Sequence, residues 1–488
     1  MKTITTLFFL LLTGATLHAQ VQKGSDMDGE AADDYSGCSV SMPDVNTIAI
    51  GAYGNDGTGN DAGHVRIYSF NSNAWIQKGS DIDGEAAGDN SGFSVSMPDA
   101  NTVAIGASEN DGSGSAAGHV RIYSWNGTMW VQKGSDIDGE TSGDRSGTSV
   151  SMPDANTVAI GAPMNDGTAN GAGHVRIYAW DGGAWVQKGS DIDGEAASDN
   201  SGSSVSMPDA NTIAIGAPWN NGTISAAGHV RIYSWNGSAW QQKGLDIDGE
   251  AADDRSGHSV SMPDSNTVAI GAPWNDGNGN NSGHVRIYSW SGSAWVLKGS
   301  DINGEFALDR TGSSVSMPDS NTVAIGAPWN NGTGSNAGHV RIFSWNGSAW
   351  QQKGNDMDGE ATGDFSGTSV SMPNTNTVAI GAFMNDGNGN DAGHVRVYGQ
   401  IPTGIIESGL PDLTVYPNPS CGTVTINLGQ MIDDLTVSVK NTLGQEVYYS
   451  HYDSATKLNL QLDVPAGVYV VTLTSQQKSL AHIKLIKE

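Results

Sequence analysis

Hydrophobic and polar side chains alternate over short stretches, and the same succession of stretches returns every 55 residues. In the copy spanning residues 91–145 we expect strands at 91–97, 102–107, 118–125 and 129–133. A Pro-Asp-Ala-Asn turn separates the first two stretches, and an Asn-Gly pair, a strong hairpin signal, follows the third. The side chains expected on the inward face are Phe93, Val95, Met97, Val103 and Ile105. Four short antiparallel strands in each repeat predict the blade of a β-propeller.

The repeat occurs seven times, and the two ends of the repeat region complement each other. A Gly-His-Val triplet marks each copy, with its histidine at His64, His119, His174, His229, His284, His339 and His394. Residues 20–23 (QVQK) match a fourth strand without the preceding three, whereas the seventh copy lacks its Trp-bearing fourth strand. We therefore predict that residues 20–24 pair with the strand at 394–398, which closes the ring and removes its last open edge. The fold class is thus all-β, with a seven-bladed, four-stranded propeller.

The connection between successive blades holds the strongest chemical signal. Its acidic residues stand at relative positions 1, 3, 5 and 9, and the set recurs in every copy. The sets are Asp26, Asp28, Glu30 and Asp34; Asp81, Asp83, Glu85 and Asp89; Asp136, Asp138, Glu140 and Asp144; Asp191, Asp193, Glu195 and Asp199; Asp246, Asp248, Glu250 and Asp254; Asp301, Asn303, Glu305 and Asp309; and Asp356, Asp358, Glu360 and Asp364. Oxygen ligands at alternate positions around a Gly turn suit Ca²⁺. The Gly stands at position 4, however, and not at position 6 as in a calcium loop. The alternative is that these carboxylates cap backbone N–H groups or pair with an arginine of a neighbouring blade.

A second candidate site lies in the loop between the second and third strands of a blade. Trp219, Trp274 and Trp329 each follow Gly-Ala-Pro and precede Asn-Asn or Asn-Asp. A flat aromatic ring beside amide and carboxylate groups is typical of sugar-binding sites, through stacking and hydrogen bonds to hydroxyls. The equivalent residues elsewhere are Gly54, Glu109, Met164 and Met384. The alternative is that the rings cover the edges of the blades as packing.

Charge and motif content exclude several function classes. The formal net charge of −29 argues against nucleic acid or anionic lipid as a partner, because both would be repelled. No unique Ser/His/Asp set, no HExxH motif and no phosphate-binding loop occurs. Catalysis usually breaks the symmetry of a repeat protein, so the sequence favours a non-enzymatic function, with the propeller as a monomer.

The repeats resemble FG-GAP repeats, the blades of integrin-α-type propellers. The pattern is carried by residues 201–205 (SGSSV), 215–218 (IGAP) and 228–233 (GHVRIY), and it recurs in the seven copies. Two features depart from the family: Ser replaces the Phe of the name motif, and the calcium-binding hairpin Asp-x-Asp-x-Asp-Gly is shortened to Pro-Asp-Ala-Asn. The resemblance implies a propeller without calcium at the family's usual hairpin.

Both ends of the chain carry export signals. Lys2, the apolar run at 7–12 and a cleavage site between Ala19 and Gln20 predict a secretory signal, and no stretch is apolar enough to span a membrane. At the other end, residues 415–419 (VYPNP), 441–447, 465–469 and 484–487 resemble the type A C-terminal sorting domain of Bacteroidetes type IX secretion. The predicted domains are a signal segment at 1–19, a propeller at 20–400, a linker at 401–411 and an Ig-like β-sandwich sorting domain at 412–488. The resemblance implies a partner in the type IX secretion machinery and a secreted or surface-attached product.

Together these observations predict a secreted or cell-surface binding or adhesion protein that presents an acidic propeller rim to extracellular glycan or protein. Repetition supports this prediction, since weak sites around a rigid ring gain avidity on a repetitive target. Two alternatives remain open: a secreted hydrolase or lyase acting on polymers, and a structural component of a surface layer or biofilm.

Overall fold

The computed structural model describes residues 20–71, 74–222, 224–400, 405–408, 410, 413–416, 420, 422–441, 445–475 and 478–487. Residues Gln22–Gly399 form one compact unit, and the chain from Gln400 onward belongs to a second. The predicted signal segment at 1–19 lies outside the described residues, as do parts of the sorting motifs at 415–419 and 441–447. The described chain contains no helix, and therefore none that could cross a membrane.

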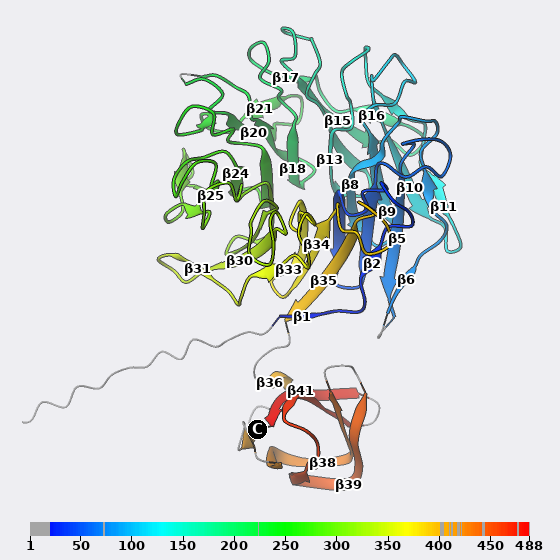
Figure 1. Cartoon of the computed structure of the whole chain (residues 1–488), viewed down its shortest axis with the longest axis vertical. Helices are drawn as coiled ribbons and strands as arrows, with labels where there is room; N and C mark the ends of the chain where they lie inside the picture. Colours follow the sequence, from blue (N-terminus) through cyan, green and yellow to red (C-terminus); the bar gives the residue numbers. More distant parts are fainter. Residues whose placement is uncertain are drawn as a thin grey trace, which may run out of the picture. The chain divides into compact units, whose positions relative to one another are not determined.

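The repeat region folds into seven antiparallel sheets, one for each copy, arranged around a common centre (Figure 1). The first blade has the order β3 (Ser39–Asp44), β4 (Thr47–Ala52), β5 (His64–Phe70) and β6 (Trp75–Gln77). Every residue of β4 is buried, because this strand lies in the middle of the sheet with neighbouring blades on both faces. The predicted all-β propeller is therefore confirmed.

The remaining blades repeat this order. The second contains β8 (Ser91–Asp99), β9 (Thr102–Ala107), β10 (His119–Trp125), β11 (Trp130–Gln132) and β12 (Ile137–Asp138); the third β13 (Ser149–Asp154), β14 (Thr157–Ala162), β15 (His174–Trp180), β16 (Trp185–Gln187) and β17 (Ile192–Asp193); the fourth β18 (Ser204–Asp209), β19 (Thr212–Ala217), β20 (His229–Trp235), β21 (Trp240–Gln242) and β22 (Ile247–Asp248); the fifth β23 (Ser259–Asp264), β24 (Thr267–Ala272), β25 (His284–Trp290), β26 (Trp295–Leu297) and β27 (Ile302–Asn303); and the sixth β28 (Ser314–Asp319), β29 (Thr322–Ala327), β30 (His339–Trp345), β31 (Trp350–Gln352) and β32 (Met357–Asp358). The seventh is built on β33 (Ser369–Asn374), β34 (Thr377–Ala382) and β35 (His394–Gln400).

The outer edge of each blade differs from the predicted single fourth strand. After β6 the chain turns away at Gly79, whose φ of +86° lies in the left-handed region, and then returns as the two-residue strand β7 (Ile82–Asp83). In β7, Ile82 pairs with Val65 and Asp83 pairs with His64. The third strand is longer than β6, so a second short segment is needed to cover its first residues. The first two acidic positions of each connection therefore lie at the edge of a blade. In the first blade these are Asp81, just before β7, and Asp83, within β7.

The chain closes the ring with its own N-terminal segment. In the seventh blade, β1 (Gln20–Gln22) lies beside β35, and β2 (Met27–Asp28) pairs with the start of the same strand. The backbone N–H of Lys23 donates to the Val397 carbonyl at 2.7 Å, and Met27 is buried. Figure 1 shows the dark blue N-terminal strands beside the yellow β35. The predicted pairing of residues 20–24 with the strand at 394–398 is confirmed.

Adjacent blades are joined by hydrophobic clusters and by repeated polar bonds. One cluster unites Val65 and Ile82 of the first blade with Val103 and Ile105 of the second. On the innermost strands, the Ser41 hydroxyl accepts the backbone N–H of the next blade's methionine at 2.9 Å. Equivalent hydroxyl bonds link the first strands of all seven blades. The first strands therefore form the inner wall of the ring.

A second set of bonds fastens the outer strands. The Trp130 indole N–H donates to the Lys78 carbonyl of the preceding blade at 2.7 Å, and the Lys78 Nζ lies 5.2 Å from the indole centroids of Trp125 and Trp130. The Lys78 Nζ also donates to Asn101, which lies in the first hairpin of the second blade, the blade that contains Trp130. Each cation–π contact contributes about 0.5–1 kcal/mol at a partly exposed site. The lysine thus connects two blades and is itself covered by indole rings.

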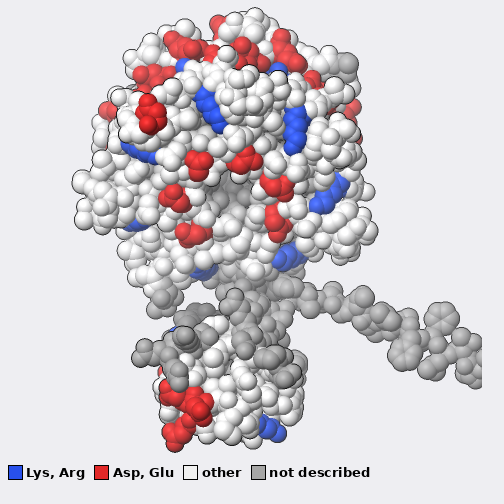
Figure 2. Space-filling view, turned by 180° about the vertical axis from the view of Figure 1, so that it is seen from behind, with Lys and Arg blue, Asp and Glu red and all other residues white. Residues whose placement is uncertain are grey.

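The long loops and the inter-blade connections lie on the same face, as the strand order predicts. Thr58 in the loop after β4 donates to the Gly84 carbonyl of the following connection at 2.6 Å, and Gly88 donates to Asn60. The opposite face carries the short hairpin turns, where Asp44 accepts the Asn46 N–H at 2.7 Å. Figure 2 shows one face of the propeller, on which acidic residues surround a central hollow and basic residues lie farther out.

The second unit is a β-structure with its own core. Its strands are β36 (Ile405–Ser408), β37 (Thr414–Tyr416), β38 (Thr423–Asn441), β39 (Glu446–Gln461), β40 (Gly467–Ser475) and β41 (Lys478–Lys487). The sequence predicted a small Ig-like β-sandwich, and in the structure hydrogen bonds connect all six strands of this β-region. The two long strands β38 and β39 continue through both halves, with a register shift between Asn427 and Ile432. The bent sheet encloses buried side chains such as Val437, Leu460 and Leu473.

Candidate functional site

The four acidic residues of each connection do not meet at one point. Asp26 and Asp28 approach His394 of the seventh blade, whereas Glu30 approaches His64 of the first blade. Asp34 is buried, and its carboxylate accepts the backbone N–H groups of Glu30 and Ala31 at 2.8 and 2.9 Å. Glu85, Glu140 and Glu195 also approach the histidine of the next blade, and Glu250, Glu305 and Glu360 pair with its arginine. The acidic residues of a connection do not form the predicted single ligand set, although calcium binding itself stays a prediction for solution measurement.

Asp34 and its counterparts have a structural role that the alternative interpretation anticipated. In addition to its backbone bonds, the Asp34 carboxylate accepts the buried Asn55 amide at 3.2 Å. Equivalent pairs, such as Asn110 with Asp89 at 3.1 Å, tie a connection to the loop of the next blade. A buried carboxylate is stable only when such donors replace its water. We assign the last acidic residue of each connection to folding.

The per-blade arginine also has a defined partner. Arg66 donates to the Asp28 carbonyl at 2.6 Å and lies 3.6 Å from Glu30, both in the preceding connection. Seven arginines occupy this position, and each donates to the equivalent carbonyl. The sequence contains three further arginines: Arg145, Arg255 and Arg310. All three stand at one other repeat position, just before the first strand of a blade.

The three candidate tryptophans pack against these additional arginines. The Arg255 guanidinium carbon lies 3.8 Å from the Trp219 ring centroid and 4.2 Å from that of Trp274. The Arg310 guanidinium carbon lies 5.1 Å from Trp274 and 4.2 Å from Trp329. From the fourth blade to the sixth, indole rings and guanidinium groups therefore follow one another alternately.

Aromatic rings continue the same series around the inner wall. Trp329 contacts Phe365 at 4.9 Å between centroids, and Tyr35 stacks on Tyr53 at 5.1 Å with an interplanar angle of 17°. The contacts linking these pairs are Phe365 with Phe383 and Phe383 with Tyr35, both at 6.0 Å, and Tyr53 with Phe93 at 5.9 Å. We call the series Trp219, Arg255, Trp274, Arg310, Trp329, Phe365, Phe383, Tyr35, Tyr53 and Phe93 the aromatic–arginine arc. The arc passes through six of the seven blades and breaks the symmetry of the ring.

Backbone conformation indicates that the arc is not required for folding. The residue before each first strand adopts a left-handed conformation in all seven repeats, with φ between 53° and 56°. Asn tolerates this region, and Asn90 and Asn200 occupy the position in two repeats. In the other five repeats the residue is Tyr35, Arg145, Arg255, Arg310 or Phe365. Bulky residues are disfavoured there, and such strain concentrates at functional sites.

Arg255 and Arg310 carry positive charge without an acidic partner. Among the described residues no carboxylate lies within 4.0 Å of either guanidinium, whereas Arg145 pairs with Glu109 at 3.2 Å. The Nε of Arg255 is buried and has no hydrogen-bond partner. Burial lowers the pKa of both arginines, although guanidinium groups remain charged in proteins. Two guanidinium groups without a carboxylate partner are able to pair with an anionic group.

His258 lies against this part of the arc and gives it a measurable pH response. Its ring meets Trp274 edge-on at 5.1 Å, and burial together with the charges of Arg255 and Arg310 lowers its pKa to about 4. Between the ordinary histidine pKa of about 6.5 and a pH of about 4, the unfolded chain binds a proton that the folded chain excludes. The free energy of unfolding therefore falls as the pH falls through this range.

We expect His258→Ser to reduce that acid sensitivity. Serine occupies the equivalent positions Ser203 and Ser313, so the variant should fold. Between about pH 6.5 and pH 4.5 it should lose about 1–2 kcal/mol less stability than the native chain, allowing for the solvent that reaches the partly exposed ring. Urea unfolding at both pH values measures the difference, with Thr148→Ser as the control at the same repeat position. Equal losses in all three proteins would show that His258 is not the titrating group.

Sequence analysis found the three tryptophans of the arc but missed its arginines and the remaining aromatic residues. The differences in sequence among the seven repeats indicate the positions of these residues. At the position of Tyr35 and at the position of Tyr53 the copies vary widely, although most of the repeat is constant. Comparing the copies for variable positions would have identified this series.

Two family models match parts of the chain. The family described as "Secretion system C-terminal sorting domain" matches residues 414–488, and the family described as "FG-GAP repeat" matches residues 241–288. No curated protein matches the chain.

Several solved structures share the propeller topology at low identity. The β-propeller domain of the Trilobed protease from Pyrococcus furiosus is 9% identical, with a TM-score of 0.39 over 70% of this chain and 90% of that one. The acylaminoacyl peptidase from Pyrococcus horikoshii is 9% identical, with a TM-score of 0.38 over 79% of this chain and 56% of that one. The GH74 xyloglucanase from Xanthomonas campestris is 10% identical, with a TM-score of 0.42 over 96% of this chain and 68% of that one.

The matched regions agree with the two units of the structure. The FG-GAP match covers parts of the fourth and fifth blades, whose sequence recurs in all seven copies, and the sorting-domain match covers most of the second unit. The sorting domain places the protein outside the cell, either released or attached to the surface, after type IX secretion. The chain is therefore an FG-GAP repeat β-propeller exported through a C-terminal type IX sorting domain.

Proposed function

We propose that the protein is a secreted or cell-surface binding protein, without catalytic activity, whose aromatic–arginine arc engages an acidic extracellular polysaccharide. The observation that carries the proposal is the pair Arg255 and Arg310, each between two indole rings and without a carboxylate partner. Guanidinium groups match carboxylates in planar geometry and bind them through paired N–H donors. A uronic acid residue supplies such a carboxylate on a sugar ring. This local attraction acts against the repulsion that the net charge of −29 exerts on an anionic polymer.

The arrangement of the arc suits an extended ligand. Its contacts pass continuously from the fourth blade through the seventh to the second, so several sugar units of one polymer would meet similar side chains. Trp219 at one end is 41% exposed, and so is Phe93 at the other. Exposed ring faces are available for stacking on sugars. A polymer that touches many weak subsites on one rigid surface gains avidity.

The repeats themselves supply substitutions for the test. In the variant Arg255→Asn/Arg310→Asn, each new residue is the one found at Asn90 and Asn200. Because Asn tolerates the left-handed backbone, we expect an unchanged melting temperature within about 2 °C. Losing two charged hydrogen-bond donors should weaken binding of oligogalacturonate by roughly 10- to 100-fold. Isothermal titration calorimetry of both proteins measures this ratio.

Arg145→Asn is the matched control, because Arg145 occupies the same repeat position but already pairs with Glu109. It should bind oligogalacturonate like the native protein. Binding of neutral xylo- and gluco-oligosaccharides is measured for comparison. These sugars are also incubated with the protein and analysed for shortened products. Unchanged binding of oligogalacturonate by the double variant, or equal binding of neutral and acidic sugars by the native protein, would refute the role of the arginines. Release of shortened products would identify a hydrolase or lyase, and capture of an extracellular protein without glycan would identify a protein ligand.

A further inference from the structure

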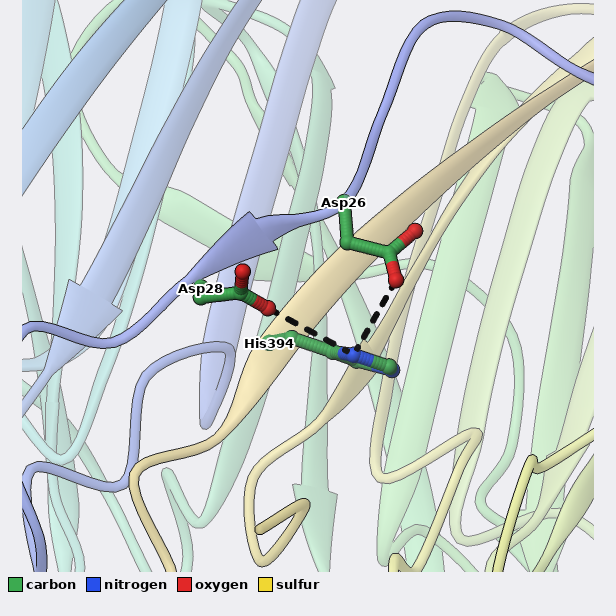
Figure 3. A group of neighbouring side chains, drawn as sticks. All are labelled: Asp26, Asp28 and His394. Atoms are coloured by element: carbon green, nitrogen blue, oxygen red, sulfur yellow. Dashed lines mark ion pairs between the residues drawn. The ribbon is translucent and has the colours of Figure 1, made fainter. Parts of the chain in front are cut away.

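Each third strand begins with a buried histidine that faces a carboxylate of an adjacent connection. His64 is 1% exposed, and its Nδ1 lies 3.7 Å from an oxygen of Asp81 and 3.9 Å from an oxygen of Glu30. Glu30 precedes the blade and Asp81 follows it, so this group spans the junction between neighbouring blades. The groups at His119, His174 and His229 are built in the same way. Figure 3 shows the group of the seventh blade, in which Asp26 and Asp28 both point toward the ring of His394.

The histidine has no hydrogen-bond partner in this pocket. Both ring nitrogens of His64 are buried and unpaired, and the Nε2 atoms of His119, His229, His339 and His394 share this state. Buried polar nitrogens normally find a partner, and an unsatisfied one costs about 1–3 kcal/mol. Nδ1 is the ring nitrogen that faces the carboxylates, so it is the atom that would bind a metal, in place of a proton.

The spacing of these atoms differs from that of a hydrogen bond. Distances of 3.7–4.0 Å between Nδ1 and carboxylate oxygens recur from blade to blade. They exceed the limit for a hydrogen bond. Two ligands of a tetrahedral Zn²⁺ ion, each at about 2.1 Å from the metal, stand about 3.4 Å apart. A contraction of a few tenths of an ångström would therefore bring Nδ1 and the facing carboxylate oxygens to metal-ligand spacing, and the three ligand atoms already lie within 4.8 Å of one another.

We propose that these junctions bind divalent transition ions, with Zn²⁺ as the reference metal, through one imidazole nitrogen and carboxylates of the two adjacent connections. Imidazole favours Zn²⁺, Cu²⁺ and Ni²⁺, whereas Ca²⁺ prefers an all-oxygen shell. In the first blade the ligands are His64, Asp81 and Glu30, with the fourth position left to water. The oxygen of Glu30 that faces His64 is not the one that faces Arg66, so the ion pair can persist. Bound metal would cross-link neighbouring blades around the ring, independently of the aromatic–arginine arc.

Zinc binding to the chelator-treated protein tests the proposal. Equilibrium dialysis with metal analysis should give about seven Zn²⁺ ions per chain, and ¹⁵N-histidine spectra should show shifted Nδ1 resonances. His258 stands at another repeat position and should not shift. Replacing the first acidic residue in three blades, Asp81→Asn/Asp191→Asn/Asp246→Asn, should lower the stoichiometry to about four.

The matched control is Asp99→Asn/Asp209→Asn/Asp264→Asn, which removes the same charge from hairpin turns where the seventh blade already has Asn374. It should keep the full stoichiometry. The proposal is overturned if Zn²⁺ fails to bind, or if it binds without shifting the repeat histidines. It is also overturned if both triple variants lose zinc equally, since general acidity would then explain the binding. Ca²⁺ that displaces Zn²⁺ at similar concentration would assign the sites to calcium.

Discussion

Removing Gln20–Asp28 should abolish cooperative folding of the propeller. The deletion takes both edge strands from the seventh blade and leaves β35 with an open edge. It also removes the buried Met27 side chain, the Asp28 carbonyl that receives Arg66, and the Lys23 carbonyl that receives Trp75. Burial of one methionine contributes about 1.5–3 kcal/mol and each hydrogen bond about 1 kcal/mol, against a total stability of about 5–15 kcal/mol. Thermal unfolding should show a midpoint lowered by more than about 10 °C, or no transition.

A circular permutant separates the loss of the strands from the loss of sequence. Residues 20–28 joined after Gly399 through an Asn-Gly-Ser hairpin, like the one between the third and fourth strands of the fourth blade, should restore the native melting temperature. In that protein all blades have continuous third and fourth strands. An unaltered melting temperature in the deletion variant would show that the ring is stable without closure.

Repetition made the fold predictable from sequence. Each blade combines period-two alternation with an Asn-Gly or Pro-Asp turn, and seven copies of one pattern leave few alternatives to a ring. The partial strands at residues 20–23 and 394–398 identified the point of closure. The short strands such as β7 were not predicted, because two residues are too few to show a period. Phe93, expected to point inward, is 41% exposed, since a bulge between Ser91 and Ser94 shifts the register.

The candidate sites were harder to predict, because their parts come from different repeats. Asp81 and Glu30 are 51 positions apart in the chain, yet both face His64. Spacing within one connection suggested instead that its four acids act together. Asp34 illustrates the difference: its carboxylate accepts the N–H groups of Glu30 and Ala31 in its own connection, as the alternative interpretation anticipated. Contacts between repeats depend on the rotation from blade to blade, and the sequence does not contain that angle.

Symmetric and asymmetric features of the ring have different physical roles. The buried arginines and histidines recur in every blade, and the lysine–tryptophan contacts recur at six junctions. The arginine and lysine contacts connect one blade to the next. The arc varies from copy to copy and adopts a backbone conformation that disfavours its own residues. Selection for stability alone would place Asn at such positions, as in Asn90 and Asn200. The departure from symmetry is therefore what an evolved binding surface on a repeated scaffold is expected to show.

Deleting residues 412–488 should stop the protein in the periplasm without unfolding the propeller. The sorting-domain family matches residues 414–488, and this region carries its own buried cluster, which includes Val437 and Leu473. None of the seven clusters between blades contains a residue from beyond the propeller. The truncated chain should therefore keep its melting temperature and its affinity for acidic glycan while losing passage across the outer membrane. Immunoblots of medium, surface and periplasmic fractions measure the change, which we expect to be at least about tenfold in the exported fraction. Fusing residues 401–488 to an unrelated periplasmic protein is the reciprocal control and should export it. Secretion of the truncated chain at the native level would assign export to the propeller itself, and a lowered melting temperature would show that the two units depend on each other for folding.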